Sequence, residues 1–258
     1  SFTCSEMIEI LILSIVQGIT EFIPVSSSSH LFILSKFTNF KEQSLSIDVS
    51  MHIGSFIAVI VYFHKDILNF VENKILFIKI LISSIPVMVA GFFLVEMNLI
   101  QEIRNLKIIG WMTLIFGLLL FVSDRLNLEK NLNKDFNFKS AIIIGIFQMI
   151  SLVPGVSRSG ITITAARLLK FKRYDAGKIS FLLSIPTLGA VSFFGIKNIV
   201  LSENSNFSSL NLICIVLSFI FSLITIRYFL KFLKSFSLNL FVIYRIILGL
   251  ALLSLAYL

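Results

Sequence analysis

Apolar runs long enough to cross a lipid bilayer recur from one end of this 258-residue chain to the other. A membrane-spanning helix needs about 20 apolar residues to cross roughly 30 Å of hydrocarbon. Hydrophobic residues make up 57% of the chain, charged residues 14%, and the mean hydropathy is +0.96. No stretch is left over for a water-soluble domain. The sequence therefore predicts one all-α integral membrane domain over residues 1–258.

Two of the apolar segments differ from ordinary spans. Those around 6–36 and 140–169 are interrupted near the middle by proline, serines and ionisable groups. Backbone that leaves the helix inside lipid must be buried in protein or line a wet cavity. We therefore predict two re-entrant helical hairpins there. Full spans are predicted at about 47–63, 75–97, 106–123, 180–197, 210–228 and 240–258.

The two interrupted segments also resemble each other. IVQGITEFIPVSSSS (15–29) aligns with IFQMISLVPGVSRSG (146–160), and SSIPVMVAGFF (83–93) is similar to LSIPTLGAVSFF (183–194). We therefore predict two sequence repeats, at about 1–123 and 140–258. A repeat made of one hairpin and three spans crosses the membrane an odd number of times. The second copy would then enter from the opposite side, as an inverted repeat.

Charge in the loops predicts the orientation. The chain carries a net charge of +8, which in a membrane protein indicates cytoplasmic loops and lipid headgroups rather than nucleic acid. Most Lys and Arg residues fall in loops on one predicted side, near 64–74, 124–139, 170–178 and 229–239. Loops on the other side, near 98–105 and 198–209, are poorer in them. The positive-inside rule then places both termini outside the cytoplasm.

The first interrupted segment carries the motif QGITEFIPVSSSSH, Gln17 to His30. Gln17 and Glu21 are four residues apart and share one helix face. The serines after the proline can cap a new helix, and His30 lies one turn beyond Ser27. Ionisable groups inside a membrane are costly and are usually functional. We therefore expect the carboxylate, the hydroxyls and the imidazole to converge.

The second motif, PGVSRSGITITAARLL (Pro154 to Leu169), predicts an anion site. Ser157 and Ser159 supply hydroxyls, and Gly160 allows tight backbone. The following helix presents free N–H groups and the positive end of its dipole. Arg158 adds a planar fork that suits phosphate oxygens. A structural ion pair between Arg158 and Glu21 is the alternative interpretation.

Phosphate hydrolysis fits these groups better than phosphate transfer from a nucleotide. The chain has no GxxxxGK[ST] loop and no carboxylate-rich two-metal cluster. Ser27 or His30 could attack phosphorus, or one of them could activate water. Glu21 could accept the proton or orient His30. The residues leave these alternatives open.

The two motifs, in this order and setting, resemble those of the undecaprenyl-diphosphate phosphatases, bacterial membrane enzymes linked to bacitracin resistance. The similarity covers essentially the whole chain, including IDVSMHIGSFIAV (47–59) and ISFLLSIP (179–186). The resemblance implies removal of the terminal phosphate from undecaprenyl diphosphate, which recycles the lipid carrier for peptidoglycan synthesis. It also implies a multi-pass protein of the cytoplasmic membrane, whose site opens to the extracytoplasmic side.

Carried over residue by residue, the resemblance assigns two sets of residues. The catalytic set is Glu21, Ser27, His30 and Arg158, and the phosphate contacts are Ser26, Ser157 and Ser159. We add Gln17 and Gly160 to the substrate-binding set because they belong to the same motifs. No metal ligands or resident cofactor are predicted. Many family members have a second glutamate where this chain has Gln17, so an assisting Mg²⁺ or Ca²⁺ would find only Glu21 as a nearby carboxylate.

Two rival functions share parts of this pattern. A second superfamily of lipid phosphatases uses PSGH followed by SRxxxxxH, but position 164, where its second histidine should stand, is Thr164. A transporter or flippase for a phosphate-bearing molecule or lipid would use the same inverted repeat. His52 is interpreted as a core residue, and the sequence indicates no oligomeric state.

Overall fold

The computed structural model describes residues 3–41, 43–69, 71–126, 129–201 and 207–258. Within these ranges the chain forms helices and no strand, apart from one isolated bridge between Lys130 and Phe171. Six of the helices are long and apolar enough to cross a membrane. The prediction of an all-α integral membrane protein is therefore confirmed.

The six long helices follow the predicted spans. They are α3 (Leu45–Tyr62), α5 (Lys74–Glu96), α7 (Leu106–Asp124), α11 (Arg173–Leu201), α12 (Ser209–Ser235) and α13 (Asn239–Tyr257). Four of them agree closely with the sequence. Helices α11 and α12 are longer than predicted, because charged residues beyond the apolar run continue the helix. Examples are Lys178 near the start of α11 and Lys234 near the end of α12.

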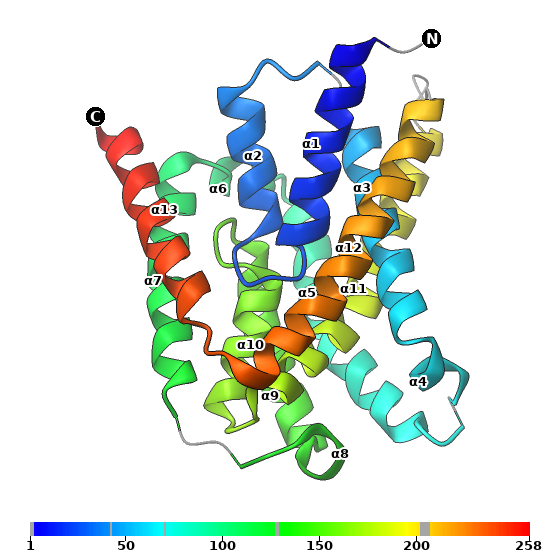
Figure 1. The fold of residues 1–258 in the computed structure, drawn as a ribbon, viewed down its shortest axis with the longest axis vertical. Coiled ribbons are helices and arrows are strands. Elements are labelled where there is room, and N and C mark those ends of the chain that lie inside the picture. The colour runs from blue at the N-terminus through cyan, green and yellow to red at the C-terminus, as the bar shows by residue number, and fades with distance from the viewer. Residues whose placement is uncertain (1–2, 42, 70, 127–128, 202–206) are drawn as a thin grey trace.

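The two interrupted segments form helical hairpins. The first consists of α1 (Cys4–Thr20) and α2 (Ser27–Phe37), and the second of α9 (Phe138–Met149), the 3₁₀ turn η1 (Ile150–Leu152) and α10 (Arg158–Leu168). Figure 1 shows them entering from opposite ends of the molecule, with their tips near its middle. Shorter helices complete the fold: α4 (His64–Leu68), α6 (Ile100–Ile103) and α8 (Leu132–Asp135). That the tips lie inside a bilayer stays a prediction.

Polar residues at the helix starts explain where several elements begin. The Thr3 side chain accepts from the Glu6 N–H, while the Glu6 carboxylate accepts from the Thr3 N–H, which is a capping box at the start of α1. Ser44, Asn105 and Asn137 accept backbone N–H groups at the starts of α3, α7 and α9. Each cap satisfies a donor that a helix leaves unpaired at its N-terminus.

Helix packing is reciprocal between the two halves. Helix α1 packs on α12, and its counterpart α9 packs on α5. Helix α3 packs on both α11 and α12, and α7 packs on α13. The first helix of each half thus packs on a helix of the other half, which supports the predicted repeat. The proline likeness does not follow it, because Pro86 lies in the second long helix of its half and Pro186 in the first of the other half. We therefore discard that part of the alignment.

Both termini lie at one end of the molecule in Figure 1, together with α6. The short helices α4 and α8 lie at the other end, within the loops that the sequence marks as basic. Residues 127–128 and 202–206, which belong to two of the predicted loops, lie outside the described ranges. The arrangement therefore separates a basic end from the end that carries the termini.

Asp124, at the end of α7, ties several elements together at the basic end. Its carboxylate receives the guanidinium groups of Arg167 at 2.9 Å and Arg173 at 2.8 Å, and the Leu238 N–H at 3.0 Å. Arg167 is fully buried, so the carboxylate compensates a charge that would otherwise be isolated. The contacts join α7, α10 and α11 to the loop before α13.

Candidate active site

The tips of the two hairpins touch. The Ser159 hydroxyl on α10 donates to the Ile23 carbonyl in the first loop at 2.9 Å. The buried Arg245 side chain of α13 binds both loops, donating to the carbonyls of Pro24 at 3.1 Å and Gly155 at 2.8 Å. Groups from the two halves of the chain therefore share one site.

Each tip ends in a serine with an unusual backbone. Ser26 has φ 75° and Ser157 has φ 74°, a region that residues with a side chain rarely adopt. Both occupy the N-cap position, before α2 and α10 respectively. Ser27 and Arg158 are then the first residues of two helices of 11 residues each. Such strain is typically kept where it positions functional groups.

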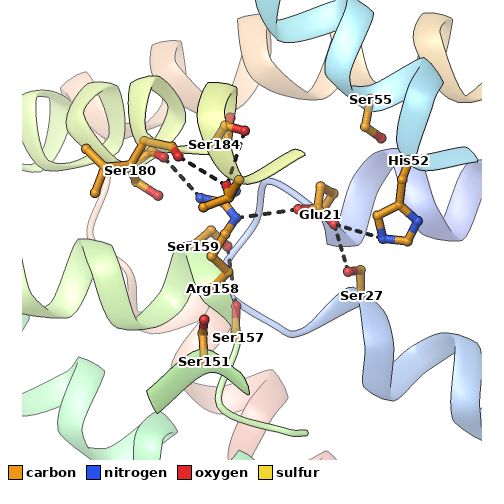
Figure 2. Close-up of polar contacts among 12 residues, drawn as sticks. Glu21, Ser27, His52, Ser55, Ser151, Ser157, Arg158, Ser159, Ser180 and Ser184 are labelled. Atoms are coloured by element: carbon orange, nitrogen blue, oxygen red, sulfur yellow. Dashed lines mark hydrogen bonds and ion pairs between the residues drawn. The ribbon is translucent and has the colours of Figure 1, made fainter. Parts of the chain in front are cut away.

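Glu21 is the centre of the polar contacts. It lies just beyond α1 with a side chain that is 7% exposed. Its Oε2 accepts from the Ser27 hydroxyl at 2.9 Å and from the Gln17 amide at 3.0 Å. Its Oε1 lies 3.5 Å from Nε of Arg158 (Figure 2). The expected convergence of carboxylate and hydroxyl is therefore present in the structure, and the Arg158 guanidinium joins them.

Arg158 has donors to spare. Nη1 donates to the Ser180 carbonyl of α11 at 3.1 Å. Nε makes only the longer ion pair with Glu21, and neither Nε nor Nη2 has a hydrogen-bond partner among the described residues. A buried guanidinium with unused donors is costly unless a ligand accepts them. The ion pair with Glu21 thus exists, but it leaves two nitrogens of the fork without a hydrogen-bond partner among the described residues.

These groups line a cavity of about 210 Å³. The lining includes Glu21, Ser26, Ser27, His52, Ser157 and Arg158. Leu188 and Val191 of α11 belong to it too, and Val191 is 46% exposed. The cavity thus combines hydroxyls and a guanidinium with an apolar wall.

His30 lies elsewhere, contrary to our expectation. Its Nδ1 is 2.6 Å from the Ser26 carbonyl oxygen, and its Nε2 forms a short hydrogen bond with the Tyr244 hydroxyl of α13. The two rings stack with centroids 5.7 Å apart. His30 is not on the cavity lining, because its ring turns from the serine run toward α13. Its catalytic role stays a prediction without support from this geometry.

Three of the residues that we predicted to contact the substrate do not line the cavity either. Gln17 is buried against Glu21, Ser159 holds the Ile23 carbonyl, and the Gly160 N–H donates to the Ser157 hydroxyl at 3.0 Å. None of the three lines the cavity. Their contacts here hold the loops in place, whereas Ser26 and Ser157 do reach the lining.

His52 is the group that the sequence interpretation missed. It projects from α3 onto the lining, with a side chain that is 23% exposed and Nε2 at 4.0 Å from Glu21 Oε2. The expectation of a core residue is therefore wrong. A signal was present, since an ionisable residue in the middle of an apolar span is rare without a function. Among the described residues, no cluster of three or more His, Cys, Asp or Glu side chains could hold a metal ion.

Comparison with known proteins adds to this geometry. The profile of the bacitracin resistance protein BacA matches residues 10–251. The undecaprenyl-diphosphatase of Pelagibacter ubique is 47% identical over 254 residues, covering 98% of this chain and 99% of the relative. Those of Saccharophagus degradans, at 38% over 267 residues, and Roseobacter denitrificans, at 37% over 264 residues, cover 98% and 97% of the chain and 99% of each relative. The chain therefore belongs to the BacA family of bacitracin resistance proteins.

Proposed function

We propose that this protein removes the terminal phosphate from undecaprenyl diphosphate, yielding undecaprenyl phosphate and inorganic phosphate. The observation that carries the proposal is Arg158, which lines a cavity together with Ser27 and Glu21 and has two nitrogens without a hydrogen-bond partner among the described residues. The names of the relatives agree with this chemistry. They favour an enzyme over a carrier built on the same repeat.

The guanidinium would hold the terminal phosphoryl group. Its planar fork offers two parallel donors to phosphate oxygens, and it compensates the charge that builds up on them. The hydroxyls of Ser26 and Ser157 on the lining add further donors. Glu21 would keep the guanidinium oriented through its ion pair at 3.5 Å.

Ser27 is the nucleophile in this proposal. Its hydroxyl already donates to Glu21 at 2.9 Å, the distance that proton transfer to a general base requires. The Ser27 oxygen bonds to the terminal phosphorus as its proton passes to Glu21. The bond from that phosphorus to the bridging oxygen breaks, and undecaprenyl phosphate leaves with the electron pair. Water then cleaves the phosphoserine and releases phosphate.

The lipid tail would leave the cavity past the apolar wall. Leu188 and Val191 line that wall, and the exposed Val191 faces the surroundings of the protein. An undecaprenyl chain is insoluble in water, so a lateral opening toward the bilayer fits it. An assisting Mg²⁺ or Ca²⁺ would be held mainly by the diphosphate, because Glu21 is the one carboxylate among the described residues of the lining. Assays with and without chelator measure that dependence.

Phosphate release from undecaprenyl diphosphate by the purified protein tests the proposal. Ser27→Ala should abolish turnover, and Glu21→Gln should lower it roughly 10²–10⁴-fold, the usual contribution of a general base. Ser35→Ala is the matched control, because Ser35 lies exposed on the same helix α2 and donates to the Phe32 carbonyl. Wild-type turnover in Ser27→Ala would contradict the assignment.

We also place the site on the extracytoplasmic side of the bacterial cytoplasmic membrane. The cavity is lined by both hairpin tips, which meet near the middle of the molecule, and the family resemblance supports an opening toward the end that carries the termini. The basic loops at the other end support a cytoplasmic location for that end.

A further inference from the structure

When water hydrolyses a phosphoserine it loses a proton, and the cavity lining holds one candidate acceptor for that proton besides Glu21. The ionisable side chains among the described lining residues are Glu21, Arg158 and His52. An arginine remains protonated in proteins and cannot act as a base. Among the described lining residues, His52 is therefore the one other ionisable group that can act as a base.

The hydrogen bond that Nδ1 of His52 makes determines which ring nitrogen can accept a proton. Nδ1 lies 2.7 Å from the carbonyl oxygen of Asp48, one turn earlier on α3. A carbonyl oxygen only accepts, so Nδ1 must carry the hydrogen. In the neutral ring the lone pair is then on Nε2, the nitrogen that Figure 2 shows directed toward Glu21 and Ser27.

Glu21 is already engaged by donors. Gln17 and Ser27 donate to Oε2, and Arg158 pairs with Oε1. The proton that Glu21 takes from Ser27 in the first step remains on it until the serine oxygen is released. Gln17, as an amide, cannot accept a proton in its place. A separate base would let water attack while Glu21 is still protonated.

We propose that His52 is a catalytic residue, the general base that activates the water in the second half of the reaction. This rests on the proposed function. One water proton passes to Nε2 of His52 as the water oxygen bonds to phosphorus. The bond between phosphorus and the Ser27 oxygen breaks, and that oxygen takes the proton back from Glu21. Phosphate leaves, and His52 gives its proton to solvent.

The charges around His52 are suited to this role. Glu21 faces its Nε2 from the end of α1 at 4.0 Å, and its carboxylate would stabilise the imidazolium once the Ser27 oxygen has taken the proton back. Asp48 stands one turn away on α3, and Arg158 on α10 is the cation of the same cavity. The ring is thus a neutral acceptor between a carboxylate and a phosphate-binding guanidinium.

A trapping experiment separates this role from a structural one. Purified His52→Gln would be mixed with farnesyl diphosphate carrying ³²P in its terminal phosphate, and quenched in acid. We expect phosphate release to fall roughly 10²–10⁴-fold. Because the first half still runs, labelled phosphoserine should accumulate at Ser27. In His52→Ala, added imidazole should restore part of the release.

His64→Gln is the matched control. Like His52, His64 has its Nδ1 at 2.7 Å from a carbonyl, that of Val61, but it is exposed at the start of α4 and does not line the cavity. It should release phosphate at the wild-type rate without trapped label.

Four outcomes overturn an assignment, and they do so separately. Wild-type release by His52→Gln removes the catalytic role, and so does slow release with neither trapped label nor rescue. If His52→Gln lowers the melting temperature in detergent, and the loss of folded protein accounts for the whole loss of activity, His52 has a packing role instead. If the wild-type protein releases no phosphate from either prenyl diphosphate, the proposed function itself fails.

Discussion

Arg158 shows how one residue can be predicted from its neighbours in sequence. It follows a serine at positive φ and opens α10, so its guanidinium is held beside Glu21 with two nitrogens lacking hydrogen-bond partners in the described chain. Both the motif and the cost of an isolated intramembrane arginine indicated an anion partner. The position within the motif therefore carried the information.

Replacing Arg158 by lysine tests how much the two parallel donors of the guanidinium contribute to the rate beyond its charge. Arg158→Lys keeps the charge but cannot offer two parallel donors, so we expect phosphate release to fall roughly 10- to 100-fold, equivalent to the loss of about 1.5–3 kcal/mol from a hydrogen bond to a charged group. Steady-state phosphate release measures it. Arg227→Lys, on the exposed face of α12, is the control. Equal rates in both variants would show that charge alone suffices.

The two histidines mark the limit of sequence reasoning at this scale. His30 stands in the motif, but its ring turns to Tyr244, which is 214 residues further along the chain. His52 stands outside the motif, yet it reaches Glu21 because α3 packs beside the first hairpin. Neither contact can be predicted from the spacing of residues along the sequence. Both depend on how helices distant in sequence pack together.

At the scale of elements, the spans could be predicted from the sequence, but the contacts that hold the hairpin loops in place could not. Apolar length alone located the six long helices, and interrupted hydropathy located both hairpins. The buried Arg245 stands inside the predicted span 240–258, but its sequence context does not show which groups it contacts. Its contacts become visible only when the loops fold onto it.

Arg245 is a positioning residue for the two loops. Its Nη1 donates to the Pro24 and Val156 carbonyls, both at 3.1 Å, and its Nη2 donates to Gly155 at 2.8 Å. A lysine has one nitrogen and cannot span these acceptors, so Arg245→Lys should lower both the melting temperature and kcat. Turnover should stay low even at saturating substrate. Unchanged melting and turnover would show that the loops hold their geometry without this residue.

At the scale of the whole molecule, the orientation in the membrane can be tested with native cysteines. Cys4 is exposed at the start of α1, whereas Cys214 is buried in α12. If the termini are extracytoplasmic, a membrane-impermeant maleimide should label right-side-out vesicles and leave inside-out vesicles unlabelled. Cys4→Ser should abolish the labelling. Labelling confined to inside-out vesicles would reverse the topology.

The predicted repeat has a consequence for how such a site can arise. Ser27 and Arg158 occupy the same place, each opening an 11-residue helix after a serine of positive φ. With the same residue in both places, this position would hold either two serines and no arginine, or two arginines and no serine. In the proposed reaction, attack by Ser27 and charge neutralisation by Arg158 therefore depend on a difference between the two helix starts.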